Sequence, residues 1–64
     1  MDNQKFGKFI KELRKKSNMT QKELGEKLNV TDKAVSKWER GLSFPDITII
    51  NSLAETFGIT SSEI

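Results

Sequence analysis

The chain has 64 residues and a net charge of +2, and a domain of this size buries only about 60% of the surface that its unfolded chain exposes. It contains no cysteine and no histidine, so it lacks a disulfide framework, the commonest general base and the commonest zinc ligand. No apolar run approaches the roughly 20 residues of a membrane span and no signal peptide opens the chain, so we expect a cytoplasmic protein with no membrane partner. Few Gly and Pro beside many Lys, Glu, Leu and Ile indicate an all-α fold.

The charge is unevenly distributed along the chain. All eleven Lys and Arg fall within residues 1–40, whereas residues 41–64 carry three acidic residues and no basic one. This asymmetry indicates a polyanionic partner for the N-terminal part. A lysine-rich helix that only faces solvent would give the same pattern, so charge alone leaves the function open.

Two helices with clear end signals are predicted in the N-terminal half. The first runs from about Gln4 to Lys16, and Asn18 tolerates the left-handed conformation that closes many helices. Its apolar face has helical spacing and consists of Phe6, Phe9, Ile10 and Leu13. Thr20-Gln-Lys-Glu23 is a capping box that opens the second helix, which ends before Asn29 and buries Leu24 and Leu28.

A short turn leads into the predicted third helix. Asn29 can adopt a positive φ, Val30 can fill the corner between the helices, and Thr31 can cap the next helix. That helix runs from about Asp32 to Arg40, and Gly41 is expected directly after its end.

The remaining sequence predicts a fourth helix and the beginning of a fifth. Pro45 and Asp46 open the fourth helix, since a proline is tolerated in the first turn and an acid favours the dipole. Gly58 ends it, and its buried stripe is expected at Ile47, Ile50, Leu53, Ala54 and Phe57. Thr60-Ser-Ser-Glu63 is a second capping box. Residues 1–64 are therefore expected to form one domain, either cut at this point or the N-terminal part of a longer protein.

The predicted third helix has two different faces. On a helical wheel, the inner arc holds Thr31, Ala34, Val35, Trp38 and Glu39, and the outer arc holds Lys33, Ser36, Lys37 and Arg40. Such an outer face can enter a DNA major groove, where cations meet phosphate or guanine and a hydroxyl can serve any base. Any surface helix also has a polar outer face, so this pattern alone leaves both interpretations open.

The preceding helix and turn favour the DNA interpretation. A short helix, a turn and a second helix meet the geometric requirement for a helix-turn-helix. Gly25 agrees, because the two helices must approach closely, whereas a glycine elsewhere in a helix only costs about 1 kcal/mol relative to Ala. A structural αα-hairpin shares parts of this pattern.

The stretch from Met19 to Gly41 begins near Thr-Gln-x-x-Leu and ends with Ser-Lys-Trp-Glu-Arg-Gly, and Phe44-Pro-Asp46 follows it. Together these motifs resemble the Cro/C1-type helix-turn-helix family. This family, also called Xre or lambda-repressor-like, comprises bacterial and phage transcriptional regulators. The resemblance covers about Phe6–Glu63, with Gly25 where the family prefers Ala and Asn29 where it prefers Gly. It implies a compact five-helix DNA-binding domain, with the helix-turn-helix at helices two and three, that binds operator DNA as a homodimer.

The resemblance also implies roles for individual residues. Base edges or groove walls would be contacted by Thr31, Asp32, Lys33, Ser36 and Lys37, and phosphates by Thr20, Gln21, Arg40 and Ser43. Gln21 suits its role because a helix N-terminus attracts anions. Asp32 could accept a hydrogen bond from a cytosine amine or only favour the helix dipole, and the general charge preference favours the dipole.

Other conspicuous residues are assigned to structure. Leu24, Val35 and Trp38 are expected in the core, and Trp38 is not expected to stack on bases because it lies on the apolar arc. Arg14 and Glu39 resemble a pair that ties helix one to helix three in the family, and we expect them near the surface; a phosphate contact is the alternative for Arg14. Phe44 either packs at the corner of helix four or is an exposed anchor for a partner.

We expect the protein to be a transcriptional regulator that binds double-stranded DNA sequence-specifically. Residues 32–40 would lie in the major groove, and repression is the favoured outcome. A protein-interaction module that uses Phe44 and the acidic C-terminal half is the alternative, but the outer face of the third helix lacks the aromatic or aliphatic anchors of such surfaces. An enzyme is not expected, since no Gly-rich phosphate loop or paired carboxylates occur, and no cofactor, metal or small-molecule ligand is indicated. We expect a monomer in dilute solution.

Overall fold

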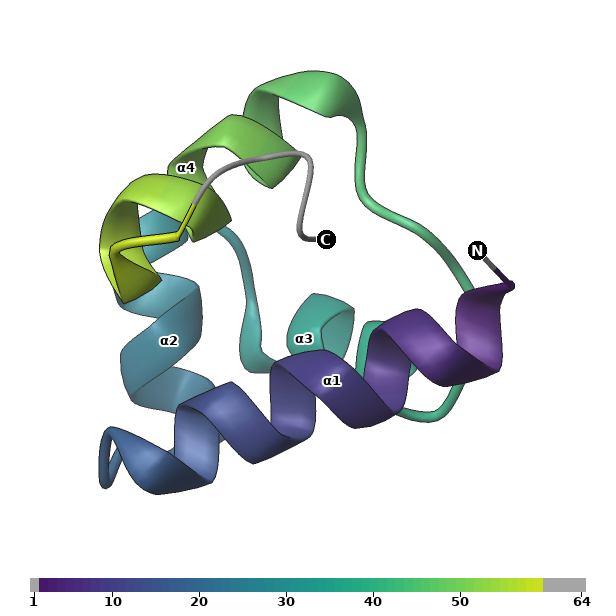
Figure 1. Ribbon diagram of the computed structural model, residues 1–64, viewed down its shortest axis with the longest axis horizontal. Helices are drawn as coiled ribbons and strands as arrows, with labels where there is room; N and C mark the ends of the chain where they lie inside the picture. The colour runs from purple at the N-terminus through teal and green to yellow at the C-terminus, as the bar shows by residue number, and fades with distance from the viewer. Residues whose placement is uncertain (1, 60–64) are drawn as a thin grey trace.

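The computed structural model describes residues 2–59, which form an all-α fold of four helices (Figure 1). Their bounds are α1 Asn3–Lys16, α2 Gln21–Leu28, α3 Asp32–Glu39 and α4 Ile47–Phe57. α3 packs against both α1 and α2, and α4 packs against α2. Within residues 2–59, no helix is long and apolar enough to cross a membrane. The fifth helix expected from Thr60 lies outside the described residues.

A polar side chain caps the start of each of these helices. Asp2, Thr20, Thr31 and Asp46 accept hydrogen bonds from the backbone N–H groups of Lys5, Glu23, Ala34 and Ile49, respectively, at 2.7–3.1 Å. The predicted capping box at Thr20 and the predicted cap at Thr31 are confirmed. α1 begins one residue earlier than expected because Asp2 supplies a cap that the apolar pattern does not reveal.

The ends of the first three helices follow the predicted signals closely. Asn18 and Asn29 have φ values of 56° and 58°, and Gly41 has a φ of 76°, so all three adopt the left-handed conformation. α3 ends at Glu39, one residue before the predicted end, and Arg40 is its C-cap.

The beginning of α4 differs from the prediction. Asp46 has extended backbone (φ −74°, ψ 174°) and its carboxylate caps the helix, so Pro45 precedes the helix instead of lying in its first turn. Ile47, expected in the buried stripe, is 70% exposed, because the first residue of α4 lies beyond the edge of the core. Ile50 and Leu53 are buried as expected.

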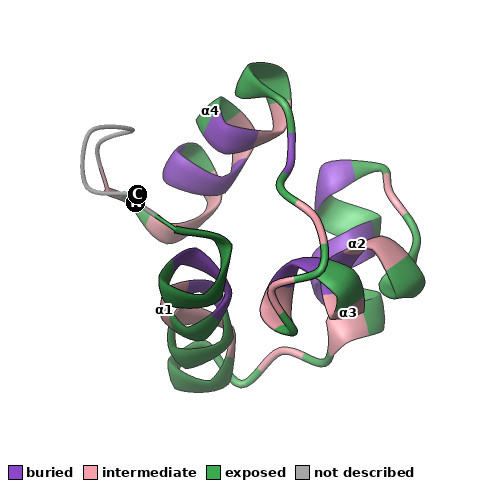
Figure 2. Ribbon diagram, turned by 90° about the vertical axis from the view of Figure 1, so that its right-hand side faces the viewer, coloured by how far each residue is buried: buried purple, intermediate pink, exposed green. Residues whose placement is uncertain are grey.

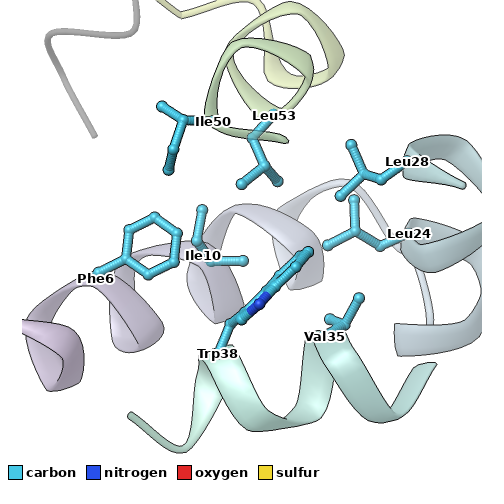
Figure 3. Close-up of a cluster of buried hydrophobic side chains, with 8 residues drawn as sticks. All are labelled: Phe6, Ile10, Leu24, Leu28, Val35, Trp38, Ile50 and Leu53. Atoms are coloured by element: carbon cyan, nitrogen blue, oxygen red, sulfur yellow. The ribbon is translucent and has the colours of Figure 1, made fainter. Parts of the chain in front are cut away.

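One apolar core connects the four helices (Figure 3). Each helix contributes two of its buried side chains, which are Phe6 and Ile10, Leu24 and Leu28, Val35 and Trp38, and Ile50 and Leu53. Figure 2 shows that the buried residues face the interior of the molecule while the outer sides of the helices are exposed. Trp38 is only 5% exposed, which confirms its predicted place in the core.

Two glycines allow backbone segments to approach closely. A Cβ at Gly7 of α1 would collide with the carbonyl oxygen of Trp38 and lie 2.8 Å from that of Glu39. The apolar pattern did not single out Gly7, although it is a mid-helix glycine like Gly25. A Cβ at Gly25 would lie 2.7 Å from the carbonyl oxygen of Val30, so the close approach expected there involves the turn before α3.

An ion pair ties α1 to α3 at the end of the core. Nε of Arg14 lies 2.7 Å from Oε2 of Glu39, and Nη2 lies 3.1 Å from Oε1. The pair was predicted near the surface, but its side chains are largely enclosed, with that of Arg14 11% exposed and that of Glu39 3% exposed. Nη1 of Arg14 also donates to the carbonyl oxygen of Met19 at 2.8 Å, which fixes the segment that enters α2.

Replacing Gly7 by Ala tests the contact between α1 and α3. Helix propensity alone favours Ala by about 1 kcal/mol, whereas overlap with two backbone carbonyls predicts destabilisation by about 1–3 kcal/mol. The two effects on the free energy of unfolding have opposite signs, so denaturant unfolding of Gly7→Ala decides between them. Lys8→Ala, at the exposed neighbouring position, is the control. A more stable Gly7→Ala domain would show that the two helices are not in close contact.

Replacing Arg14 by Met tests the buried ion pair. The substitution leaves the Glu39 carboxylate buried without its charge partner, so we expect the free energy of unfolding to fall by about 3–5 kcal/mol. The double variant Arg14→Met/Glu39→Met buries no unpaired charge and should recover part of this decrease. A decrease below about 1 kcal/mol, typical of exposed pairs, would contradict the burial of this pair.

Candidate DNA interface

The two faces of α3 differ as the sequence predicts. Val35 and Trp38 are buried in the core, whereas Lys33 and Lys37 are exposed and Ser36 is half-buried. Lys33 and Lys37 are one helical turn apart and therefore lie on the same side of α3. Because the inner face is fixed in the core, the outer face has a defined orientation.

The N-terminal end of α3 carries the two other residues predicted to contact bases. Thr31 is exposed, and its hydroxyl oxygen accepts the bond from the N–H of Ala34 at 3.1 Å, which leaves the hydroxyl proton free to donate. Asp32 is exposed in the first turn, where a negative charge is favoured by the helix dipole.

The N-terminus of α2 supplies two of the predicted phosphate contacts. Thr20 uses its backbone N–H and its hydroxyl oxygen in the capping box with Glu23, at 2.9 and 3.0 Å. Gln21 and Lys22 are the first residues of the helix, so their backbone N–H groups have no carbonyl partner within it. Free N–H groups and the positive end of the dipole together attract an anion.

The side chain of Gln21 makes a contact that the sequence does not predict. Its Nε2 donates to Oε1 of Glu39 at 3.1 Å, and the residue is half-buried. The two residues are 18 positions apart and belong to different helices. Helical periodicity carries no signal for a contact of this kind, because it only relates residues within one helix.

The other predicted phosphate contacts lie at and beyond the end of α3. Arg40 is exposed, and its Nε donates to the carbonyl oxygen of Ser36 at 3.3 Å, which uses one of the five guanidinium N–H groups. Ser43 is half-buried in the segment that leads to α4.

Phe44 anchors that segment to α1. Its ring lies 4.5 Å from the ring of Phe6, centroid to centroid, with the planes tilted by 53°. The side chain is nevertheless 47% exposed. Phe44 therefore packs on Phe6 of α1 while part of its side chain stays accessible.

Comparison with known proteins agrees with this geometry. The chain matches the Helix-turn-helix family over residues 10–64. It is 34% identical over 59 residues to the HTH-type transcriptional activator BcrR of Enterococcus faecalis, and the aligned region covers 92% of this chain and 29% of the relative. It is 36% identical over 56 residues to the HTH-type transcriptional regulator ImmR of Bacillus subtilis, covering 88% and 44%. The chain thus spans less than half the length of these relatives.

A solved structure shares both the fold and part of the sequence. The P22 c2 repressor protein, in complex with a synthetic operator, superposes with a TM-score of 0.84 at 28% identity, covering 89% of this chain and 86% of that one. The family match, the two relatives and the α2–turn–α3 geometry agree with one another. The chain belongs to the Cro/C1-type helix-turn-helix family of transcriptional regulators.

Proposed function

We propose that this chain binds double-stranded DNA sequence-specifically as the DNA-binding domain of a transcriptional regulator, acting in the cytoplasm with α3 in the major groove. The observation that carries this proposal is the exposed basic face of α3 opposite an inner face held in the core. An α-helix with its side chains is about 10–12 Å in diameter, which suits the roughly 12 Å width of a major groove. The operator complex of the similar P22 c2 repressor supports the same partner.

Base readout is assigned to the exposed side of α3. Lys33 and Lys37 would donate to guanine or to phosphates on the groove wall, and Ser36 would bond a base edge between them. Thr31 would reach the groove at the start of the helix. Asp32 is assigned to the helix dipole, because a carboxylate close to phosphates opposes binding.

Phosphate contacts are assigned to both ends of the helix-turn-helix. Thr20 and Gln21 would hold one phosphate at the start of α2, and Arg40 and Ser43 another beyond the end of α3. These contacts fix the position of α3 on the duplex and supply affinity that does not depend on sequence.

We also propose that two copies bind adjacent half-sites about one helical turn apart. Three large apolar side chains stay exposed in or next to the segment after α3. They are Leu42, Phe44 and Ile47, which are 64%, 47% and 70% exposed. They could meet a second copy on the same DNA. Within residues 2–59 these three side chains are too few to form the roughly 1,200–2,000 Å² interface of a stable dimer, so we propose a monomer in dilute solution.

Selection of bound sequences from random duplexes tests the function and the symmetry together. The expected result is an enriched two-fold symmetric site. The absence of any enriched sequence would contradict specific DNA binding, whereas enriched sites without symmetry would contradict only the paired arrangement. We propose repression as the outcome of binding at a promoter, and transcription in vitro from a promoter that carries the selected site should therefore fall.

Lys37→Ala tests base readout by α3. We expect binding to weaken by about 1–3 kcal/mol and the preference at one position of each half-site to relax. Lys8→Ala removes the same charge from an exposed position of α1 and controls for the general positive field. Equal decreases in affinity for both variants with unchanged sequence preference would show that α3 does not read the bases.

Arg40→Ala tests the assignment of phosphate contacts. Binding should weaken alike for all sequences, and the slope of log K against log salt should decrease by about one for each phosphate that Arg40 neutralises. Titrations of the selected site and of an unrelated duplex at several salt concentrations measure both effects. Weaker binding to the selected site alone would reassign Arg40 to base readout.

A further inference from the structure

The Glu39 carboxylate connects three helices at the end of α3. Its Oε2 accepts from Nε of Arg14 at 2.7 Å, and its Oε1 accepts from Nη2 of Arg14 and from Nε2 of Gln21, both at 3.1 Å. The Glu39 side chain is only 3% exposed. Its bonds thus join the last residue of α3 to the first residue of α2 and to α1.

The chemistry of these groups fixes the orientation of the Gln21 amide. A carboxylate can only accept hydrogen bonds, so the NH₂ end of the amide must face it and the carbonyl end must face elsewhere. Arg14 provides the positive charge that compensates the burial of the Glu39 carboxylate. One side-chain N–H and the backbone N–H of Gln21 are then left for other acceptors.

An ordered Gln21 side chain is an advantage for binding. A side chain that is immobilised only in a complex lowers affinity by about 2- to 10-fold, because its rotamer freedom disappears on binding. The bond to Glu39 restricts this freedom before DNA arrives. It also connects the start of α2 to the end of α3, the two places where phosphate contacts are proposed.

We propose that Glu39 is a positioning residue for DNA binding, in addition to stabilising the fold. Its carboxylate holds the Gln21 amide so that Gln21 meets a DNA phosphate at a fixed place relative to α3. This inference rests on the proposed function. If Glu39 served stability alone, the DNA affinity of the folded protein would not depend on the bond to Gln21.

A double-mutant cycle on the selected duplex tests this role. Glu39→Gln, Gln21→Ala and the double variant are compared with the original chain, and each dissociation constant is corrected for the folded fraction measured by circular dichroism. Glu39→Gln should weaken binding about 3- to 10-fold when Gln21 is present, and by less than about 2-fold in the Gln21→Ala background.

The expected change in DNA affinity for Glu39→Gln is opposite in direction to the effect of the lost negative charge. Glu39→Gln removes a negative charge, which through the general field alone would strengthen binding to DNA. Glu26→Gln makes the same change of charge at an exposed position of α2 and is the matched control. We expect this control to bind as tightly as the original chain or more tightly.

A second substitution keeps the test decisive if Glu39→Gln does not fold. Glu39→Asp retains the negative charge but withdraws the carboxylate by one methylene from both Arg14 and Gln21. After correction for the folded fraction, its effect on DNA affinity should show the same dependence on Gln21. Additive decreases of affinity in the cycle would overturn the inference while leaving DNA binding intact. Failure of the original chain to prefer any duplex would overturn the proposed function and this inference together.

Discussion

A helix of eight residues cannot hold its own conformation in water, because isolated helices shorter than about 12–15 residues are marginal even with favourable sequences. α3 is such a helix, so its existence and its direction depend on what surrounds it. Val35 and Trp38 fix its inner face in the core, Thr31 caps its start, and Glu39 binds its end to α1 and α2. The other helices can be understood as the support for this short segment.

The local features of the fold could be predicted from the sequence because their causes are local. The capping box at Thr20, the left-handed residues Asn18 and Asn29, and the two faces of α3 each depend on residues within one helical turn or two. The start of α4 was misplaced since Asp46 can act either as a cap or as a first-turn acid, and the sequence alone does not distinguish these roles.

The features that escaped prediction depend on contacts between elements. Gly7 looks like an ordinary weak point in a helix until the carbonyl groups at the end of α3 are seen against it. The bond between Gln21 and Glu39 likewise requires the relative placement of two helices. The Arg14–Glu39 pair was identified through family resemblance, but its burial became evident only with the packing of α1 on α3. The proposed roles of the DNA-contact residues are predictions from resemblance that the geometry accommodates.

The contact between Phe6 and Phe44 has a practical consequence for work with this protein. It brings the first turns of α1 beside the segment that follows α3, and Figure 1 shows the start of α1 next to that segment. A purification tag or fusion partner joined ahead of Asp2 would therefore emerge close to the proposed DNA surface. Binding measured on such a fusion would include the steric bulk and charge of the tag, so the tag should be removed before affinities are compared.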